Sequence, residues 1–308
     1  MDSATKKNTY TGIGLALLTI AVWAGNFIIA RGTSKMIPPI SLAFYRWSLA
    51  SLLIFFIGYK KFMAERAFVY AHRRYLFWAA LLGITLFNTF IYVAGHSTSA
   101  INLALIGTTS APIFVTIVSA VFRKETITRL RIAGLLFCIA GVVVLISKGS
   151  MATLLAFRFT AGDVWILLSA FVFSIYTILV KRKPPTISPI TFLFTIFIGG
   201  TLLLLPLFIA ESWLTPPVLW DKHLIGSILY LGIGASVIGF MCWYAAIARI
   251  GSVRTALFGN LIPIVSTLEA VWLLGETITI VHVISGALVI TGLVIANVRM
   301  SQVQAGNS

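Results

Sequence analysis

Charge is scarce in this sequence, and acidic charge is the scarcest. Only 10% of the 308 residues are Asp, Glu, Lys or Arg, and Asp and Glu together number eight. A soluble domain carries about 25% charged residues, so the composition excludes an ordinary soluble protein. The acidic residues are also scattered, with Asp163, Glu211 and Asp221 each standing alone. This argues against a membrane enzyme, because general acid–base catalysis needs such groups within reach of one substrate.

Cysteine is nearly absent, and no nucleotide-binding motif is present. Cys138 and Cys242 both fall inside apolar stretches, where a thiol behaves as a small buried hydrophobe. We therefore expect neither a disulfide nor a metal site. The pattern G-x-x-x-x-G-K-[ST] does not occur, which argues against ATP as the energy source within this chain. We expect no cofactor.

Long hydrophobic runs fill the rest of the chain, which is 59% hydrophobic with a mean hydropathy of +1.01. Runs of roughly 18–22 residues match the thickness of the hydrocarbon core of a bilayer. The sequence predicts an all-α integral membrane protein of ten transmembrane helices. The predicted stretches are 11–31, 39–59, 75–95, 101–122, 131–147, 162–180, 190–210, 224–247, 254–274 and 281–298.

The net charge of +15 has a distribution that indicates membrane topology rather than nucleic-acid binding. If the N-terminus is cytoplasmic, 17 of the 23 Lys and Arg residues fall in cytoplasmic segments, and Arg46 lies within a predicted helix. Cytoplasmic loops carry such an excess of cations. We therefore expect a multi-pass protein of the plasma membrane (the bacterial inner membrane) with both termini cytoplasmic. The five cations on the outer side are Arg31, Lys35, Lys148, Arg158 and Lys222.

A segment of the chain is repeated at an offset of 151 residues. Residues 112–146 and 263–297 share ten of 35 positions, including Pro112/Pro263, Glu125/Glu276 and Gly141/Gly292. The chain therefore divides into halves, 11–147 and 161–298, with five predicted helices each. Because five is odd, the second half must be inverted in the membrane, as is common in secondary transporters.

The repeated pattern P-I-x(11)-E-T-I-T-x(12)-G resembles that of the drug/metabolite transporter superfamily, EamA type. The resemblance covers residues 11–298. It implies a carrier of small metabolites, often amino acids or related compounds, that frequently acts in efflux. It also implies a central cavity lined by stretches 11–31, 75–95, 101–122, 162–180, 224–247 and 254–274.

The repeated prolines point to the position of a binding site. Pro112 and Pro263 lack an N–H and release the carbonyls of Thr108 and Gly259, and paired interruptions at mid-depth often mark the site of a transporter. The alternative is that each proline only kinks its helix. Around them, aromatic, amide and hydroxyl groups recur at helical spacing, although each could instead be packed or face lipid. The candidate cavity residues are Trp23, Asn26, Asn88, Tyr92, Thr108, Tyr176, Trp243, Gly259 and Asn260.

Two ionisable residues, Arg46 and Glu269, lie inside predicted helices at similar depth. Such residues are costly in a membrane and are functional hypotheses by default. They could pair and stabilise the fold, Glu269 could take up a proton during transport, or either could contact a charged end of the substrate. The repeated Glu125 and Glu276, at the start of predicted helices, suit a structural role. The repeated Gly141 and Gly292 suit close helix packing.

Together these features predict a secondary transporter that moves a small organic metabolite across the membrane by alternating access and that could act as a monomer. Its partners are the lipid bilayer and the metabolite, without nucleic acid. The alternatives are a polytopic membrane enzyme acting on a lipid-linked substrate and a passive channel.

Overall fold

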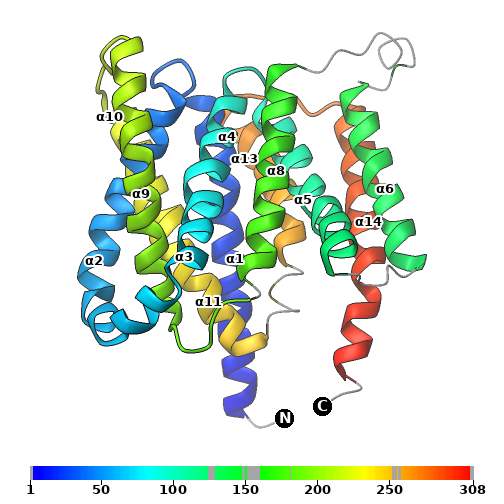
Figure 1. The fold of residues 1–308 in the computed structure, drawn as a ribbon. Coiled ribbons are helices and arrows are strands. Elements are labelled where there is room, and N and C mark those ends of the chain that lie inside the picture. The colour runs from blue at the N-terminus through cyan, green and yellow to red at the C-terminus, as the bar shows by residue number, and fades with distance from the viewer. Residues whose placement is uncertain are drawn as a thin grey trace.

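The computed structural model describes residues 3–123, 129–147, 150, 160–180, 182–251, 255 and 258–305, and these residues form helices without any β-strand (Figure 1). The helices of the first half of the chain are α1 (Ser3–Gly32), α2 (Pro39–Ala71), α3 (Arg73–Ala80), the π-helix η1 (Leu81–Leu86), α4 (Phe87–Gly95), α5 (Ala100–Arg123) and α6 (Arg129–Ile146). Those of the second half are α8 (Ala161–Val180), α9 (Pro189–Leu214), α10 (Lys222–Leu229), the π-helix η2 (Tyr230–Ile238), α11 (Gly239–Ile250), the 3-10 helix η3 (Gly259–Leu261), α13 (Ile262–Leu274) and α14 (Ile280–Ala305).

Each predicted apolar stretch overlaps these helices, although α2 continues twelve residues beyond its predicted end at 59 and part of the stretch 254–274 lies outside the described residues. Seven helical segments of the described chain are long and apolar enough to cross a membrane, and three shorter apolar helices accompany them. Large apolar side chains on their outer faces are exposed, for example Phe56 at 76%, Leu214 at 85% and Trp272 at 84%. A soluble protein rarely leaves such large apolar surfaces exposed, so the all-helical membrane fold expected from the sequence is confirmed.

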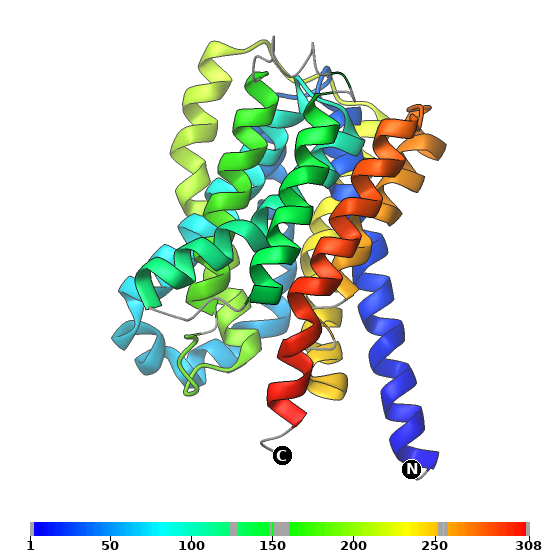
Figure 2. The same cartoon turned by 90° about the vertical axis from the view of Figure 1, so that its right-hand side faces the viewer.

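Two antiparallel helix pairs flank a central group of helices. In Figure 1, α2 packs beside α9 at one side of the bundle and α6 packs beside α14 at the other, with α1, α4, α5, α8, α11 and α13 between them. Figure 2 looks onto the α6–α14 pair. α1 begins and α14 ends at the same end of the bundle.

The α6–α14 pair is held by small residues at close range. Ser285 donates a hydrogen bond to the carbonyl of Gly141 at 2.7 Å, and the Cys138 thiol lies 3.6 Å from the carbonyl of Val289. A Cβ atom on Gly292 would lie 2.5 Å from the carbonyl oxygen of Gly134. The close packing predicted for Gly141 and Gly292 is therefore present, and glycine is required there because the backbones nearly touch.

The α2–α9 pair is fixed at both ends by carboxylates. Glu211, near the end of α9, accepts hydrogen bonds at 2.6–3.1 Å from the backbone N–H groups of Ile40 and Ser41 at the start of α2. Glu65, near the end of α2, accepts hydrogen bonds from the N–H and hydroxyl of Ser188 at the start of α9. The first N–H groups of a helix lack partners within the helix and attract negative charge, so each helix caps the other.

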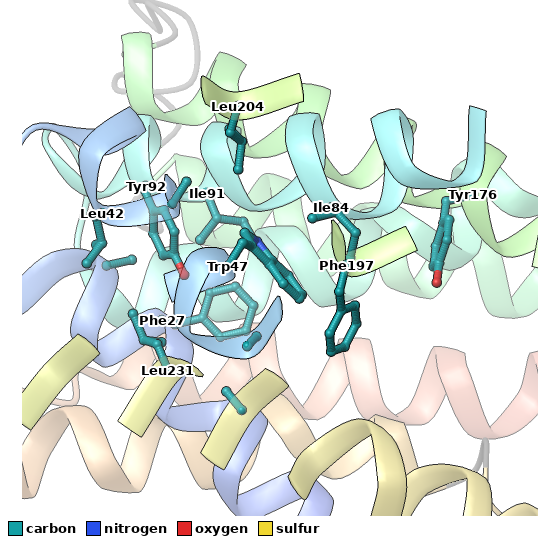
Figure 3. Close-up of a cluster of buried hydrophobic side chains, with 14 of the residues drawn as sticks. Phe27, Leu42, Trp47, Ile84, Ile91, Tyr92, Tyr176, Phe197, Leu204 and Leu231 are labelled. Atoms are coloured by element: carbon teal, nitrogen blue, oxygen red, sulfur yellow. The ribbon is translucent and has the colours of Figure 1, made fainter. Parts of the chain in front are cut away.

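The hydrophobic core lies between the α2–α9 pair and the central helices. Figure 3 shows Trp47 of α2 between Tyr92 of α4 and Phe197 of α9. The ring centroids of Trp47 and Phe197 are 4.9 Å apart in an edge-to-face arrangement, which aromatic pairs favour. This core positions the residue next to Trp47 in the sequence, Arg46.

Candidate functional site

Arg46 lies at the centre of a buried polar cluster. Its side chain is 3% exposed and extends from α2 into the central helices. Nη1 donates to Oδ1 of Asn26 at 2.7 Å, to Oδ1 of Asn88 at 2.8 Å and to the hydroxyl of Tyr92 at 2.6 Å. Nε donates to the hydroxyl of Ser236 at 2.8 Å. The cluster therefore joins α1, α2, α4 and η2.

The guanidinium of Arg46 has no carboxylate partner among the described residues. Within the described part of the chain, an ion pair is found between Lys61 and Glu65, near the end of α2, with 3.1 Å between Nζ and Oε1. The partners of Arg46 are two amides, a phenol and a hydroxyl, and its guanidinium carbon lies 4.7 Å from the ring centroid of Trp47. These neutral groups satisfy hydrogen bonds without cancelling the charge.

Three of the cluster's members, Asn26, Asn88 and Tyr92, were predicted from the sequence as cavity residues. Ser236 was not. It lies in the apolar run of η2, where a hydroxyl is an isolated polar group, and its counterpart at an offset of 151 is Thr85, also buried. These two hydroxyl residues at equivalent positions of the repeat were the sequence feature that could have identified Ser236 as a site residue.

Two π-helical segments, at equivalent positions of the repeat, adjoin the cluster. At an offset of 151, η1 would begin at residue 232 and end at 237, and η2 spans Tyr230–Ile238. Ser236 lies within η2 and Asn88 comes two residues after η1. Such segments are rare and occur frequently at functional sites.

Side chains of the central helices bind carbonyls in or beside the π-helical segments. Trp23 of α1 donates its ring N–H to the carbonyl of Ala235 at 3.0 Å. Thr19 of α1 donates to the carbonyl of Gly239, and Ser169 of α8 donates to the carbonyl of Phe87. These bonds provide partners for carbonyls that a wider helical turn leaves poorly satisfied, which buried polar groups require in a membrane.

Aromatic rings of α1, α8 and α11 pack among the central helices. Trp23 and Trp243 have ring centroids 5.1 Å apart, and Trp23 also packs edge-to-face on Phe240. The ring of Tyr176 in α8 packs against Gly83 of η1, where a larger residue would not fit. Trp23, Trp243 and Tyr176 thus lie in the central group of helices.

The predicted proline sites differ from each other. α5 continues through Pro112, and the Thr108 hydroxyl donates to the carbonyl of Ala104 at 2.6 Å. Pro263 was expected near the middle of a helix, but it lies in the first turn of α13, directly after η3. The carbonyl of Gly259 accepts the N–H of Ile262 and so already has a partner. Asn260 belongs to η3, and its side chain lies outside the described residues.

The structure does not form the ion pair between Arg46 and Glu269 that their similar depth suggested. Ser266, one turn before Glu269 in α13, donates to the carbonyl of Ala24 in α1, whereas Asn26 of α1 binds Arg46. Positions 24 and 26 are about 200° apart around a helix. α1 therefore separates the two charges, and Oε2 of Glu269 is buried without a hydrogen-bond partner among the described residues.

Glu276 binds a helix N-terminus, although not that of the helix it precedes. Its carboxylate accepts hydrogen bonds at 2.8 and 3.1 Å from the N–H groups of Ala100 and Ile101, at the start of α5. It therefore links the segment between α13 and α14 to the first half of the chain. The repeat counterpart, Glu125, lies outside the described residues.

The fold and this cluster define a multi-pass, all-helical membrane protein with a polar centre enclosed by helices from both halves. The chain belongs to the EamA-like transporter family, whose model matches residues 10–147 and again residues 160–298.

Curated relatives and a solved structure agree with this assignment. The chain is 31% identical to an uncharacterized transporter of Archaeoglobus fulgidus over 96% of its own length and all of that protein. It is 27% identical to a probable amino-acid metabolite efflux pump of Salmonella typhimurium, over 91% and 93% of the two chains. A solved crystal structure shares the fold with a TM-score of 0.64 and 19% identity, covering 97% of this chain and 99% of the other.

Proposed function

We propose that this chain is a secondary transporter that exports a small organic metabolite, an amino acid or a similar compound, by alternating access. The observation that carries this proposal is that the hydrogen-bond partners of Arg46 come from both halves of the chain. Asn26, Asn88 and Tyr92 come from the first family-matched region, and Ser236 comes from the second. A polar site shared between two halves changes its access when the halves move against each other.

The two halves, 11–147 and 161–298, act in this proposal as inverted repeats of five helices. The equivalent π-helical segments and the α6–α14 contact between residues 151 apart support it. The excess of cations supports cytoplasmic termini and insertion in a plasma membrane, which is the inner membrane in bacteria. A monomer suffices, because residues of a single chain enclose the cluster.

The names of two relatives support amino-acid-like substrates and export. One is the probable efflux pump noted above, and another is a probable terminal-alkyne amino-acid exporter of Streptantibioticus cattleyicolor, 31% identical over 61% of each chain. Both names refer to amino acids or amino-acid metabolites.

Purified protein in liposomes tests the proposal. We expect saturable counterflow of at least one of the twenty common L-amino acids or their N-acetyl forms. Flux that rises linearly with concentration would indicate a channel, and turnover of lipid-linked substrates would indicate an enzyme. Protein-free liposomes and liposomes with heat-unfolded protein are the controls.

A further inference from the structure

The positive charge of Arg46 is buried and hydrogen-bonded, and it has no carboxylate partner among the described residues. Each of the four groups that accept its hydrogen bonds is neutral, and the ion pair formed by the described residues lies elsewhere. Burial of a charge is costly, and ionisable groups within membrane helices are normally paired or face a pathway. A purely structural cross-link between these helices could be made by neutral side chains at lower cost.

The hydrogen bonds at Nη1 exceed what this nitrogen can donate. An arginine Nη carries two protons, and three oxygens lie within 2.8 Å of Nη1. One of them, the hydroxyl of Tyr92, also has Oδ1 of Asn26 as an acceptor at 3.0 Å. One acceptor can therefore be replaced without leaving a neighbouring group unsatisfied, and Nη2 makes no hydrogen bond to the described residues.

We propose that Arg46 recognises a carboxylate of the transported solute, which replaces one of the neutral acceptors at Nη1 and engages Nη2. This inference rests on the proposed transport function and specifies the class of its substrate as carboxylate-bearing. Guanidinium and carboxylate groups match in shape and form two parallel charge-assisted hydrogen bonds. The carboxylate also supplies the negative charge that the cluster lacks, so the solute is bound most strongly in its anionic or zwitterionic form.

The Tyr92 hydroxyl is the acceptor that the solute carboxylate would replace at Nη1 of Arg46. When a carboxylate takes its place on Arg46, the hydroxyl remains bonded to Asn26. The ring of Trp47, against which the guanidinium lies, keeps the orientation of Arg46 fixed during this exchange.

The test compares a transported amino acid with its carboxamide, which has the same shape without the negative charge. In wild-type proteoliposomes, we expect the carboxylate to compete for counterflow about 10- to 100-fold more strongly than the carboxamide, the range of a charge-assisted bidentate contact. In Arg46→Gln we expect this ratio to approach one. Arg46→Lys keeps the charge and is expected to retain part of the preference.

Ser51→Ala is the matched control. Ser51 is also in α2, and its hydrogen bond to Thr201 of α9 at 2.8 Å joins two helices without involving Arg46. This variant should keep the wild-type ratio. A merely structural Arg46 would lower thermal stability and slow transport of both compounds alike, leaving the ratio unchanged in its variants.

Two results would overturn the proposal: equal competition by carboxylate and carboxamide in wild type, or a wild-type ratio in Arg46→Gln. The first needs no variant and applies even if Arg46→Gln fails to fold. Failure of the proposed function is a different result, namely no saturable counterflow of any compound in the panel by wild-type protein.

Discussion

The thiol of Cys138 in α6 lies 3.6 Å from the carbonyl of Val289 in α14, and the two residues are 151 positions apart, the offset of the internal repeat. Equivalent residues can meet in this way only close to a local two-fold axis. The glycines around them obey the same relation, with Gly141 against Ser285 and Gly292 against Gly134. The α6–α14 contact is therefore a self-complementary surface, built twice within a single chain.

Gly292→Ala should destabilise the protein through this surface. The added Cβ would lie 2.5 Å from the carbonyl oxygen of Gly134 and 2.8 Å from the backbone nitrogen of Cys138, so α6 and α14 must separate. We expect a loss of about 1–3 kcal/mol, typical of overpacking, measured as a lower thermal midpoint in detergent. Gly286→Ala is the matched control in the same helix, because its Cβ would meet nothing within 4 Å. Equal midpoints for the two variants would contradict the prediction.

The caps of the α2–α9 pair should act independently. Glu65→Ala and Glu211→Ala each remove the acceptor of N–H groups at one helix start, which we expect to cost about 0.5–2 kcal/mol. The two caps act on α2 at Ser41 and Glu65, about 36 Å apart along the helix, and effects at such a distance add. The losses in unfolding free energy should therefore sum in the double variant to within about 0.5 kcal/mol. A much smaller combined loss would show that one cap does not form without the other.

Glu269→Gln tests the proton-uptake hypothesis. Oε2 of Glu269 is buried and has no hydrogen-bond partner in the described part of the chain, and an amide in its place cannot ionise. We expect the variant to fold with at least wild-type thermal stability, because the cost of a buried unpaired charge is removed. We also expect it to keep counterflow and to lose any acceleration by a pH gradient. A wild-type response to the gradient would exclude Glu269 as the coupling group.

Cysteine labelling tests the proposed orientation. In a Cys242→Ser background, Leu219→Cys places a thiol between α9 and α10, where the native side chain is 84% exposed. Tyr70→Cys places one at the opposite end of the bundle, where the native side chain is 69% exposed. With cytoplasmic termini, a membrane-impermeant maleimide should label Leu219→Cys in intact cells and Tyr70→Cys only after the membrane is opened. The reverse pattern would require inverted insertion.

The sequence allowed the helices to be predicted because hydropathy reports burial in lipid directly. It did not reveal η1 and η2, since a π-helix differs from an α-helix in hydrogen-bond register and not in apolar content. Glycines at Gly83 and Gly234 fall within these segments, but the chain has 24 glycines and many lie in regular helices.

The polar cluster was partly predictable for a related reason. Position along a helix determines depth, so Arg46 and Glu269 could be placed at the same level of the membrane. Depth does not determine which side of a neighbouring helix each residue faces, and α1 stands between them. Asn26, Tyr92 and Arg46 were each identified from the sequence as candidates, whereas the hydrogen bonds that join them required the three-dimensional arrangement.

The reciprocal capping of α2 and α9 has a mechanical consequence. A slide of either helix along the other by one turn, about 5.4 Å, would detach both Glu65 and Glu211 from their N–H groups. Tilting the pair as a unit detaches neither. The two helices can thus rotate together as a rigid pair, but neither can slide along the other. Because Arg46 projects from α2, any rotation of the pair displaces its guanidinium relative to α1 and α4.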